Sequence, residues 1–285
     1  MPNQRVVLIT GASAGIGRAT ADRLHGDGWT VVGASRRGTG SPGWTPLVMD
    51  VDDDESVASG VQAVVAEHGG LHAVVACAGW GLAGAVEQTP ISMAKEQIET
   101  NFWGAVRVVQ AALPIMRGQG GGRVVLVSSI GGIIGIPFQA FYSASKFALE
   151  GYGEALAYEV APFGVEVSMI EPGNVRTDFT ASRRDVRPPP GPGPGDGDGD
   201  GDSGDNGGGD PYAAMVAKAV GLMARDEANG VAADDVAAAI AAILRSPHPR
   251  RRVSVGKAGE RVGVIAKRLM PYRLFERAAK SSLGV

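Results

Sequence analysis

The sequence predicts an α/β protein built on a doubly wound parallel sheet, with strand order 3-2-1-4-5-6-7 and helices on both faces. Three observations predict this class: short apolar runs alternate with helical stretches, a glycine-rich turn follows the first run, and polar or glycine residues follow the later ones. The 285 residues are 44% hydrophobic and 20% charged. This is enough for one large domain, which we expect to cover residues 1–285.

Each predicted element follows from its local pattern. The predicted strands are short apolar runs at residues 6–9, 30–35, 47–49, 71–76, 123–127, 165–170 and 253–255. Helical patterning covers residues 18–24, 52–68, 91–116, 138–160, 212–223 and 232–244. Open parallel sheets bind ligands at the carboxyl ends of their strands, so the residues just after each strand are the candidates for a site.

The first of these strand ends is the turn Thr10-Gly11-Ala12-Ser13-Ala14-Gly15-Ile16-Gly17. Gly11 lets the chain turn, Gly15 lets the backbone approach a pyrophosphate, and Gly17 lets the helix pack on the strand. Glycines between a strand and a helix often serve tight packing alone. Here the turn follows the first strand of a repeating strand–helix chain, which favours a dinucleotide.

The second predicted strand ends at Ser35, and Arg36 follows it, 19 residues after Gly17. An acidic residue at this distance would bind the ribose hydroxyls of NAD, whereas an arginine suits the 2′-phosphate of NADP. A solvated arginine pair at a strand end is the plainer interpretation. Because no carboxylate stands at this strand end, we expect NADP(H) rather than NAD(H).

Four polar residues form the candidate catalytic group. Tyr142 and Lys146 are one helical turn apart and so share a helix face, although such pairs also occur by chance on solvated helices. A neighbouring ammonium favours the phenolate and is expected to lower the tyrosine pKa from its usual value of about 10. Ser129 follows the fifth strand, 13 residues before Tyr142. Asn101 interrupts a long helical stretch, where it either tolerates a kink or holds a water at a break.

The chain resembles the short-chain dehydrogenase/reductase family in the identity, order and spacing of these residues. The resemblance covers residues 5–180 and extends more loosely to about residue 256. The resemblance implies a Rossmann-like fold in which Tyr142 is the acid/base, Lys146 lowers its pKa and binds the nicotinamide ribose, Ser129 orients the carbonyl, and Asn101 holds a relay water. It also implies that Asp50 lies by the adenine and Thr177 by the nicotinamide amide. The motif and the resemblance together predict these cofactor-binding residues: Gly11, Ser13, Ala14, Gly15, Ile16, Gly17, Ser35, Arg36, Asp50, Val51, Ala78, Gly79, Tyr142, Lys146, Pro172, Gly173, Val175 and Thr177. One departure is Ala76-Cys77-Ala78-Gly79, which stands where the family usually has Asn-Asn-Ala-Gly.

The predicted function is NADP(H)-dependent interconversion of a lipophilic secondary alcohol and its ketone or aldehyde. The stretches 142–151 and 252–256 look like those of hydroxysteroid and retinol dehydrogenases. The candidate substrate-pocket residues are apolar, as a lipophilic substrate would require, although such residues also build cores: Trp80, Leu82, Ile133, Ile134, Ile136, Phe138 and Phe179. A catalytically idle NADP-binding protein and a sugar-nucleotide epimerase stay open as alternatives on the same fold.

Composition excludes several other classes. A net charge of −3 argues against a general nucleic-acid binder, and no apolar run reaches the roughly 18 residues of a membrane span. Cys77 is the single cysteine, so the chain has no internal disulfide and no cysteine metal cluster. The acids at 52–55 cap a helix, and we expect no metal site. We expect a cytoplasmic homo-oligomer that acts on a small molecule.

Two segments differ from the rest in composition. Residues 180–230 form a predicted substrate-side segment that contains a Pro/Gly/Asp-rich insertion at 188–210, whose composition predicts disorder. Residues 257–285 form a basic helical extension in which apolar residues alternate with arginine and lysine. Such a helix suits peripheral contact with an anionic membrane, and it suits packing on its own domain or on a partner equally well.

Overall fold

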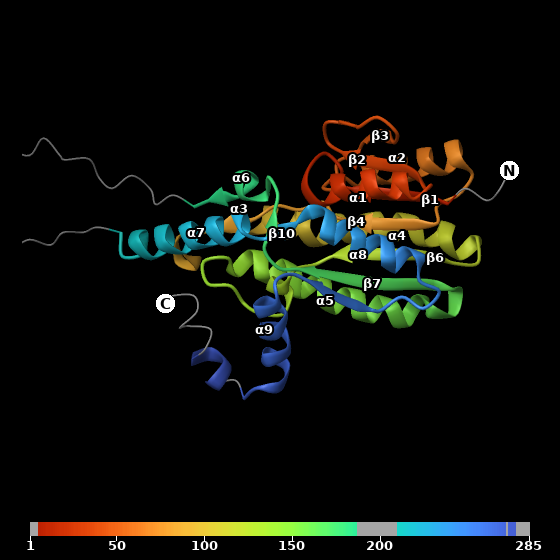
Figure 1. The fold of residues 1–285 in the computed structure, drawn as a ribbon. Coiled ribbons are helices and arrows are strands. Elements are labelled where there is room, and N and C mark those ends of the chain that lie inside the picture. Colours follow the sequence, from red (N-terminus) through yellow and green to blue (C-terminus); the bar gives the residue numbers. More distant parts are fainter. Residues whose placement is uncertain (1–4, 187–209, 272, 278–285) are drawn as a thin grey trace, which may run out of the picture.

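The computed structural model describes residues 5–186, 210–271 and 273–277, without the side chain of Arg268. Among these residues a central sheet of seven parallel strands has the order β11-β7-β6-β4-β1-β2-β3 (Figure 1). Its strands are β1 (Val6–Thr10), β2 (Thr30–Ser35), β3 (Thr45–Val48), β4 (Ala73–Ala76), β6 (Gly122–Val127), β7 (Val165–Pro172) and β11 (Arg252–Val255). Counted along the chain within this sheet, the order is the predicted 3-2-1-4-5-6-7, so the doubly wound fold is confirmed.

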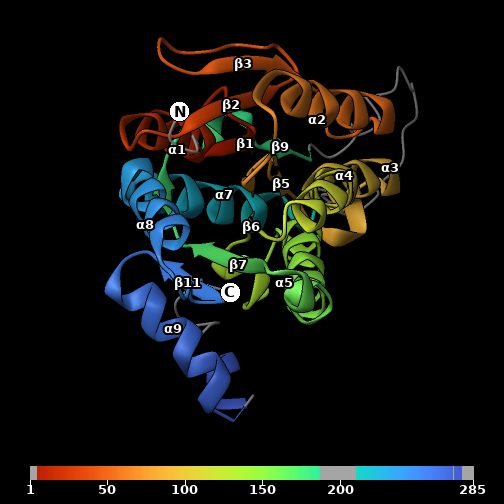
Figure 2. The ribbon, with the colours of Figure 1, turned by 90° about the vertical axis from the view of Figure 1, so that its right-hand side faces the viewer.

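Helices cover both faces of the sheet (Figure 2). On one side lie α1 (Gly15–Gly26) and α8 (Ala233–Arg245); on the other lie α2 (Asp54–His68), α4 (Gly104–Gly118) and α5 (Ala140–Val160). Neighbouring strand residues point to opposite faces, and β1 shows the consequence. Val7 packs with Leu24 and Ile240 of the first pair of helices, whereas Leu8 belongs to the core under the other three. The strand is thus buried on both sides, as its unbroken apolar run predicts.

Smaller elements cover the carboxyl edge of the sheet. They are β5 (Leu82–Ala83) paired with β9 (Arg184–Asp185), β8 (Val175–Arg176) paired with β10 (Val231–Ala232), α6 (Phe179–Ser182), α7 (Ala213–Ala228), and the short turns η1 (Val86–Gln88) and η3 (Ile130–Gly132). A further turn, η4 (Ala161–Phe163), precedes β7 at the amino edge of the sheet. Most of the insertion predicted to be disordered lies outside the described residues. Its last residue, Asp210, is described and accepts a 2.5 Å hydrogen bond from Gln88 Nε2.

The long helix predicted over 91–116 is broken in the structure. It consists of α3 (Ile91–Ile98), a π-helical turn η2 (Glu99–Trp103) and then α4. Asn101 lies in the π turn, where its side chain bonds to a neighbouring backbone segment. Single π turns inside α-helices are frequent at functional sites. The break that the asparagine suggested is therefore present.

The C-terminal part leaves the sheet beyond its β11 edge. Helix α9 (Ala258–Leu269) projects away from the other helices in both views (Figures 1 and 2). Its first turn is fixed by Glu260, whose carboxylate accepts hydrogen bonds from the backbone of Lys257 and from Asn174. A further helical turn covers 273–277, and the rest of the predicted extension lies outside the described residues. Within the described chain no helix has the length and apolarity needed to cross a bilayer. The predicted boundaries of the single domain (1–285), of the substrate-side segment (180–230) and of the C-terminal extension (257–285) stay predictions.

Candidate active site

A cavity of about 890 Å³ lies at the carboxyl edge of the sheet. All eighteen residues predicted to bind the cofactor line it, together with Ser129. Asn101 is not among the lining residues, because it is buried behind Gly79. Elements from both halves of the chain therefore meet where the topology of an open α/β sheet places a ligand.

The glycine turn has the backbone shape that a pyrophosphate needs. Gly11 and Gly15 have φ angles of +68° and +55°, which side-chain-bearing residues rarely adopt. A Cβ on Gly17 would collide with the carbonyl oxygen of Gly11, so helix α1 begins in close contact with the turn. The N-terminus of α1 carries backbone N–H groups and a positive dipole end. The turn therefore fits a dinucleotide phosphate.

The end of β2 presents an unused hydrogen-bonding group to the cavity. Ser35 is buried, and its Oγ has no hydrogen-bond partner within the described chain. Arg36 and Arg37, which follow it, are exposed and line the cavity at the same place. A buried hydroxyl without a partner costs free energy, and a ligand oxygen would satisfy it. Hydroxyl and arginines together fit a phosphorylated ribose.

The acids after β3 divide into two roles. As predicted, Asp53 caps α2 by accepting a 2.6 Å hydrogen bond from Ser56 N. Asp52 instead lines the cavity beside Asp50 and accepts a 2.8 Å hydrogen bond from Thr100 Oγ1. Burial raises the pKa of Asp52, the largest effect on that group. The run of acids at a helix start could not show that Asp52 lines the cavity. Asp52 differs from the other acids of the run by its contact with Thr100, which is far along the chain.

Ser129, Tyr142 and Lys146 come together at the other end of the cavity. Ser129 follows β6 by two residues, and its Oγ accepts a hydrogen bond of 3.0 Å from Gly131 N. Lys146 Nζ donates a hydrogen bond of 2.8 Å to the Val127 carbonyl oxygen and lies 5.9 Å from the centroid of the Tyr142 ring. Tyr142 also hydrogen-bonds with Ser129. The strand end and the helix thus meet over one cavity, as their spacing predicted.

The pKa of Tyr142 differs from the expected direction. Burial raises it to about 12; the hydrogen bond with Ser129 acts against this rise, and the charge of Glu227 adds to it. Burial also lowers the pKa of Lys146 to about 8. The expected net lowering of the Tyr142 pKa is therefore absent in the free protein, because desolvation of the phenolate is the largest effect on that group.

Asn101 supports this end of the site from behind. Its Oδ1 accepts a hydrogen bond from Trp80 N, and its Nδ2 donates to Trp80 O, both at 3.0 Å. Nδ2 also lies 3.2 Å from Ser145 Oγ, on the same helix as Lys146. A Cβ on Gly79 would touch both Asn101 Oδ1 and Lys146 Nζ. The π turn, the loop after β4 and helix α5 are therefore joined through Asn101.

The unusual loop Ala76-Cys77-Ala78-Gly79 is held by the first strand. Thr10 Oγ1 accepts hydrogen bonds of 3.1 Å from the backbone nitrogens of both Cys77 and Ala78. Cys77 is half-buried beside the cavity, and burial raises its pKa to about 11. The loop therefore lines the cavity with backbone and a neutral thiol.

The substrate side differs from the predicted apolar pocket. Of the seven predicted residues, Trp80, Ile136 and Phe179 line the cavity, whereas Leu82, Ile133, Ile134 and Phe138 do not. Leu82 is buried in β5. Phe138 has a φ of 60°, and helix α5 begins at Ala140, two residues later than predicted.

Polar residues that the sequence did not identify share this side. The described residues in question are Glu96, Gln139, Asp178, Arg184 and Glu227. They come from α3, α7, β9 and two loops, far apart along the chain, so no local pattern marks them. The cavity near Tyr142 is therefore mixed in character, with an aromatic wall and a charged one.

With the fold and the site described, the comparisons place the chain among known proteins. The family model for short chain dehydrogenases matches residues 5–188. A 3-ketodihydrosphingosine reductase of Bacteroides thetaiotaomicron is 35% identical over 277 residues, which are 97% of each chain. The human 17-beta-hydroxysteroid dehydrogenase type 1 is 39% identical over 193 residues, 61% of this chain and 58% of its own. The crystal structure of a short-chain dehydrogenase from Streptomyces avermitilis has a TM-score of 0.77 at 29% identity and covers 98% of both chains.

The chain belongs to the short-chain dehydrogenase/reductase family. It is accordingly an oxidoreductase of CH–OH groups with an NAD(P)-binding Rossmann fold. The glycine turn, the Ser35 hydroxyl and the cavity are compatible with that cofactor. The choice between NADP and NAD and the roles of single residues are proposals, which follow below.

We predict that NADPH affinity weakens as the pH rises through about 8, where Lys146 loses its proton in the free protein. A protonated lysine favours an anionic nucleotide, so the dissociation constant should be level below that pH and rise by up to about tenfold per pH unit above it. A fluorescence titration at several pH values measures this. Lys146→Met, the control, should bind weakly with little dependence on pH. A level dissociation constant in the parent protein would contradict the assignment.

Proposed function

We propose that this protein reduces the ketone of a long-chain lipid with NADPH, with Tyr142 as the proton donor. The observation that carries the proposal is the meeting of Ser129, Tyr142 and Lys146 at one end of a cavity whose other end is the glycine turn. When bound there, the cofactor supplies hydride. The protein's residues then have to orient the carbonyl and deliver one proton to its oxygen.

The raised pKa of Tyr142 supports the reducing direction. At neutral pH a phenol with a pKa of about 12 is protonated and can donate its proton to the carbonyl oxygen. Ser129 would donate a second hydrogen bond to that oxygen as negative charge develops on it. Lys146, still largely protonated at neutral pH, would bind the nicotinamide ribose and favour the phenolate that remains after proton transfer. Asn101 would hold the water through which Tyr142 regains its proton.

The comparisons favour a lipid substrate. The Bacteroides relative, which matches nearly the whole chain, is named for the reduction of 3-ketodihydrosphingosine, a long-chain ketone. The steroid dehydrogenase matches only about three fifths of the chain. The aromatic wall of Trp80 and Phe179, whose ring lies 5.9 Å from the Tyr142 ring, suits an apolar chain beside the carbonyl. Cytoplasmic location and a homo-oligomeric state stay predictions.

Tyr142→Phe should lower turnover by at least about 100-fold, because the ring stays while the proton donor is lost. NADPH binding should change little, since the cavity keeps its shape. Tyr152→Phe on the same helix is the matched control: its ring packs on Phe102, and burial raises its pKa to about 12 as well, but it does not line the cavity. Single-turnover kinetics and a cofactor titration test both variants. Turnover of Tyr142→Phe within tenfold of the parent would refute the proposed role.

Arg36 and Ser35 are the basis for proposing NADP(H) over NAD(H). Arg36→Asp should lower the ratio of kcat/KM for NADPH to that for NADH by at least about tenfold, because a carboxylate repels the 2′-phosphate and accepts ribose hydroxyls. Arg117→Asp, at the far end of α4, should leave the ratio unchanged. Equal affinity of the parent protein for the two cofactors would overturn the preference.

We also propose that α9 rests on an anionic membrane surface. Val262, Ile265 and Leu269 lie on one face of the helix with 63%, 57% and 79% of their surface exposed, whereas Val264 on another face is buried. Exposed cations at Lys257, Arg261, Arg273 and Arg277 flank this face. Apolar residues bordered by cations complement lipid headgroups, each cation contributing about 1 kcal/mol near an anionic surface.

The parent protein should sediment with vesicles that contain phosphatidylglycerol and much less with pure phosphatidylcholine vesicles, and salt should weaken the binding. Changing Ile265 and Leu269 to Glu should abolish it. Val48→Glu, on the opposite edge strand and 68% exposed, is the control that should still bind. If the double variant instead dissociates an oligomer seen in sedimentation velocity, the face belongs to a second copy and the membrane proposal fails.

A further inference from the structure

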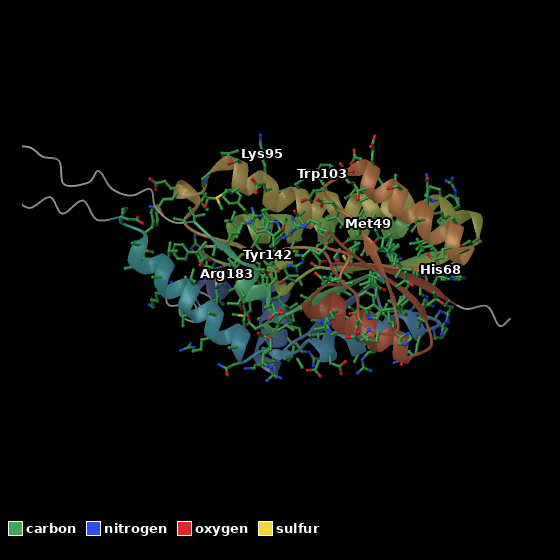
Figure 3. The ribbon with its side chains drawn as sticks, turned by 90° about the horizontal axis from the view of Figure 1, so that it is seen from above. Met49, His68, Lys95, Trp103, Tyr142 and Arg183 are labelled. Carbon is green, nitrogen blue, oxygen red and sulfur yellow. The ribbon has the colours of Figure 1, made fainter. Side chains whose placement is uncertain are left out.

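The cavity wall carries a carboxylate to which neither the fold nor the catalytic group assigns a role. Glu227, near the end of α7, lines the same cavity as Ser129 and Tyr142. Only 13% of its side chain is exposed. Figure 3 labels Tyr142 and Arg183, which pairs with Glu227, at the end of the molecule where α7 lies. The charge of Glu227 raises the pKa of Tyr142, so it acts on the catalytic group itself.

The contacts of Glu227 fix its position and pair it with one arginine. Its carboxylate accepts a hydrogen bond from Thr180 Oγ1 and lies 3.3 Å from Arg183 Nη1. Arg183 is almost fully buried, and its Nε also pairs with Asp185 at 3.3 Å. One guanidinium is therefore shared by two carboxylates, so the formal charge of the three side chains is −1. Asp185 is about half exposed, whereas Glu227 is the carboxylate of the group that lines the cavity.

The described charged residues that line this side of the cavity have contacts of their own. Arg184 pairs with Glu96 at 2.7 Å and stacks on the Trp80 ring at 4.3 Å. Asp178, which also lines the cavity, adds a further carboxylate. Lys146 is directed toward Val127 O, beneath Tyr142. The substrate end of the cavity is thus acidic overall, with an aromatic wall beside it.

We infer that Glu227 binds an ammonium group adjacent to the substrate carbonyl, so that the preferred substrates are long-chain amino ketones. This rests on the proposed function and names its substrate class. With the carbonyl oxygen at Ser129 and Tyr142, a cation on the neighbouring carbon can face Glu227 while the alkyl chain follows Trp80, Ile136 and Phe179. A charge-assisted hydrogen bond in a partly buried site discriminates strongly against a neutral analogue. The substrate in the name of the Bacteroides relative is itself an amino ketone.

The test compares an amino ketone with its deamino counterpart of equal chain length, using NADPH and kcat/KM as the readout. The parent should prefer the amino ketone at least about tenfold. Glu227→Gln should remove this preference by lowering kcat/KM for the amino ketone only. Glu67→Gln, an exposed change on α2, is the control that should alter neither value. Melting temperature and NADPH affinity show whether each variant is folded.

Three outcomes separate the two claims. Reduction of both ketones with no preference in the parent, or a preference that survives Glu227→Gln, would overturn the ammonium site and leave the proposed function intact. Reduction of neither ketone would overturn the proposed function itself. If Glu227→Gln does not fold, Glu227→Asp keeps the charge on a shorter side chain. That variant should retain a reduced preference for the amino ketone, and loss of activity toward both ketones alike would count against the ammonium site.

Discussion

The hydrogen bond from Lys146 Nζ to the Val127 carbonyl oxygen is the contact on which the geometry of the site depends. It joins helix α5 to the last residue of β6, two positions before Ser129. Tyr142, one turn earlier on α5, is thereby fixed beside the Ser129 hydroxyl. A buried ammonium without such a partner would cost several kcal/mol, so the bond constrains the helix as well as the lysine. Burial makes this possible and also changes the chemistry, because it favours the neutral forms of both Tyr142 and Lys146.

The sheet and the nucleotide half of the site could be predicted because their signals are local. Apolar runs mark the strands, and the parallel topology brings every strand end to one edge, so Ser35 and Thr177 are found together although they are far apart along the chain. Residues such as Asp52 and Glu227 could not be found this way, since an acid in a helical pattern looks like a cap or a solvated face. The rise of the Tyr142 pKa could not be predicted from the sequence either. Residue spacing indicates the nearby lysine charge, but it does not show that burial removes water from around the Tyr142 hydroxyl.

Charged side chains line both the cofactor side and the substrate side of the cavity. Arg36, Arg37 and the amino end of α1 are placed where a nucleotide carries its phosphates, with Asp50 and Asp52 beside these arginines. Asp178 and Glu227 line the substrate side. The ammonium site proposed above would draw a cationic substrate group to Glu227, while the arginines and the helix end would attract the cofactor phosphates. The same arrangement disfavours anionic carbonyl compounds such as keto acids.

The elements that would recognise a lipid lie in the part of the chain beyond the family model, which ends at residue 188. Helix α7, with Glu227, and helix α9 both follow that limit, and the Bacteroides relative extends over nearly the whole chain. Glu260 in α9 accepts hydrogen bonds from both nitrogens of Asn174, which itself lines the cavity. Through these hydrogen bonds the first turn of α9 is attached to a residue that lines the cavity. The part of the chain after residue 188 would therefore carry both the helix proposed to contact a lipid surface, α9, and the carboxylate proposed to select the substrate, Glu227.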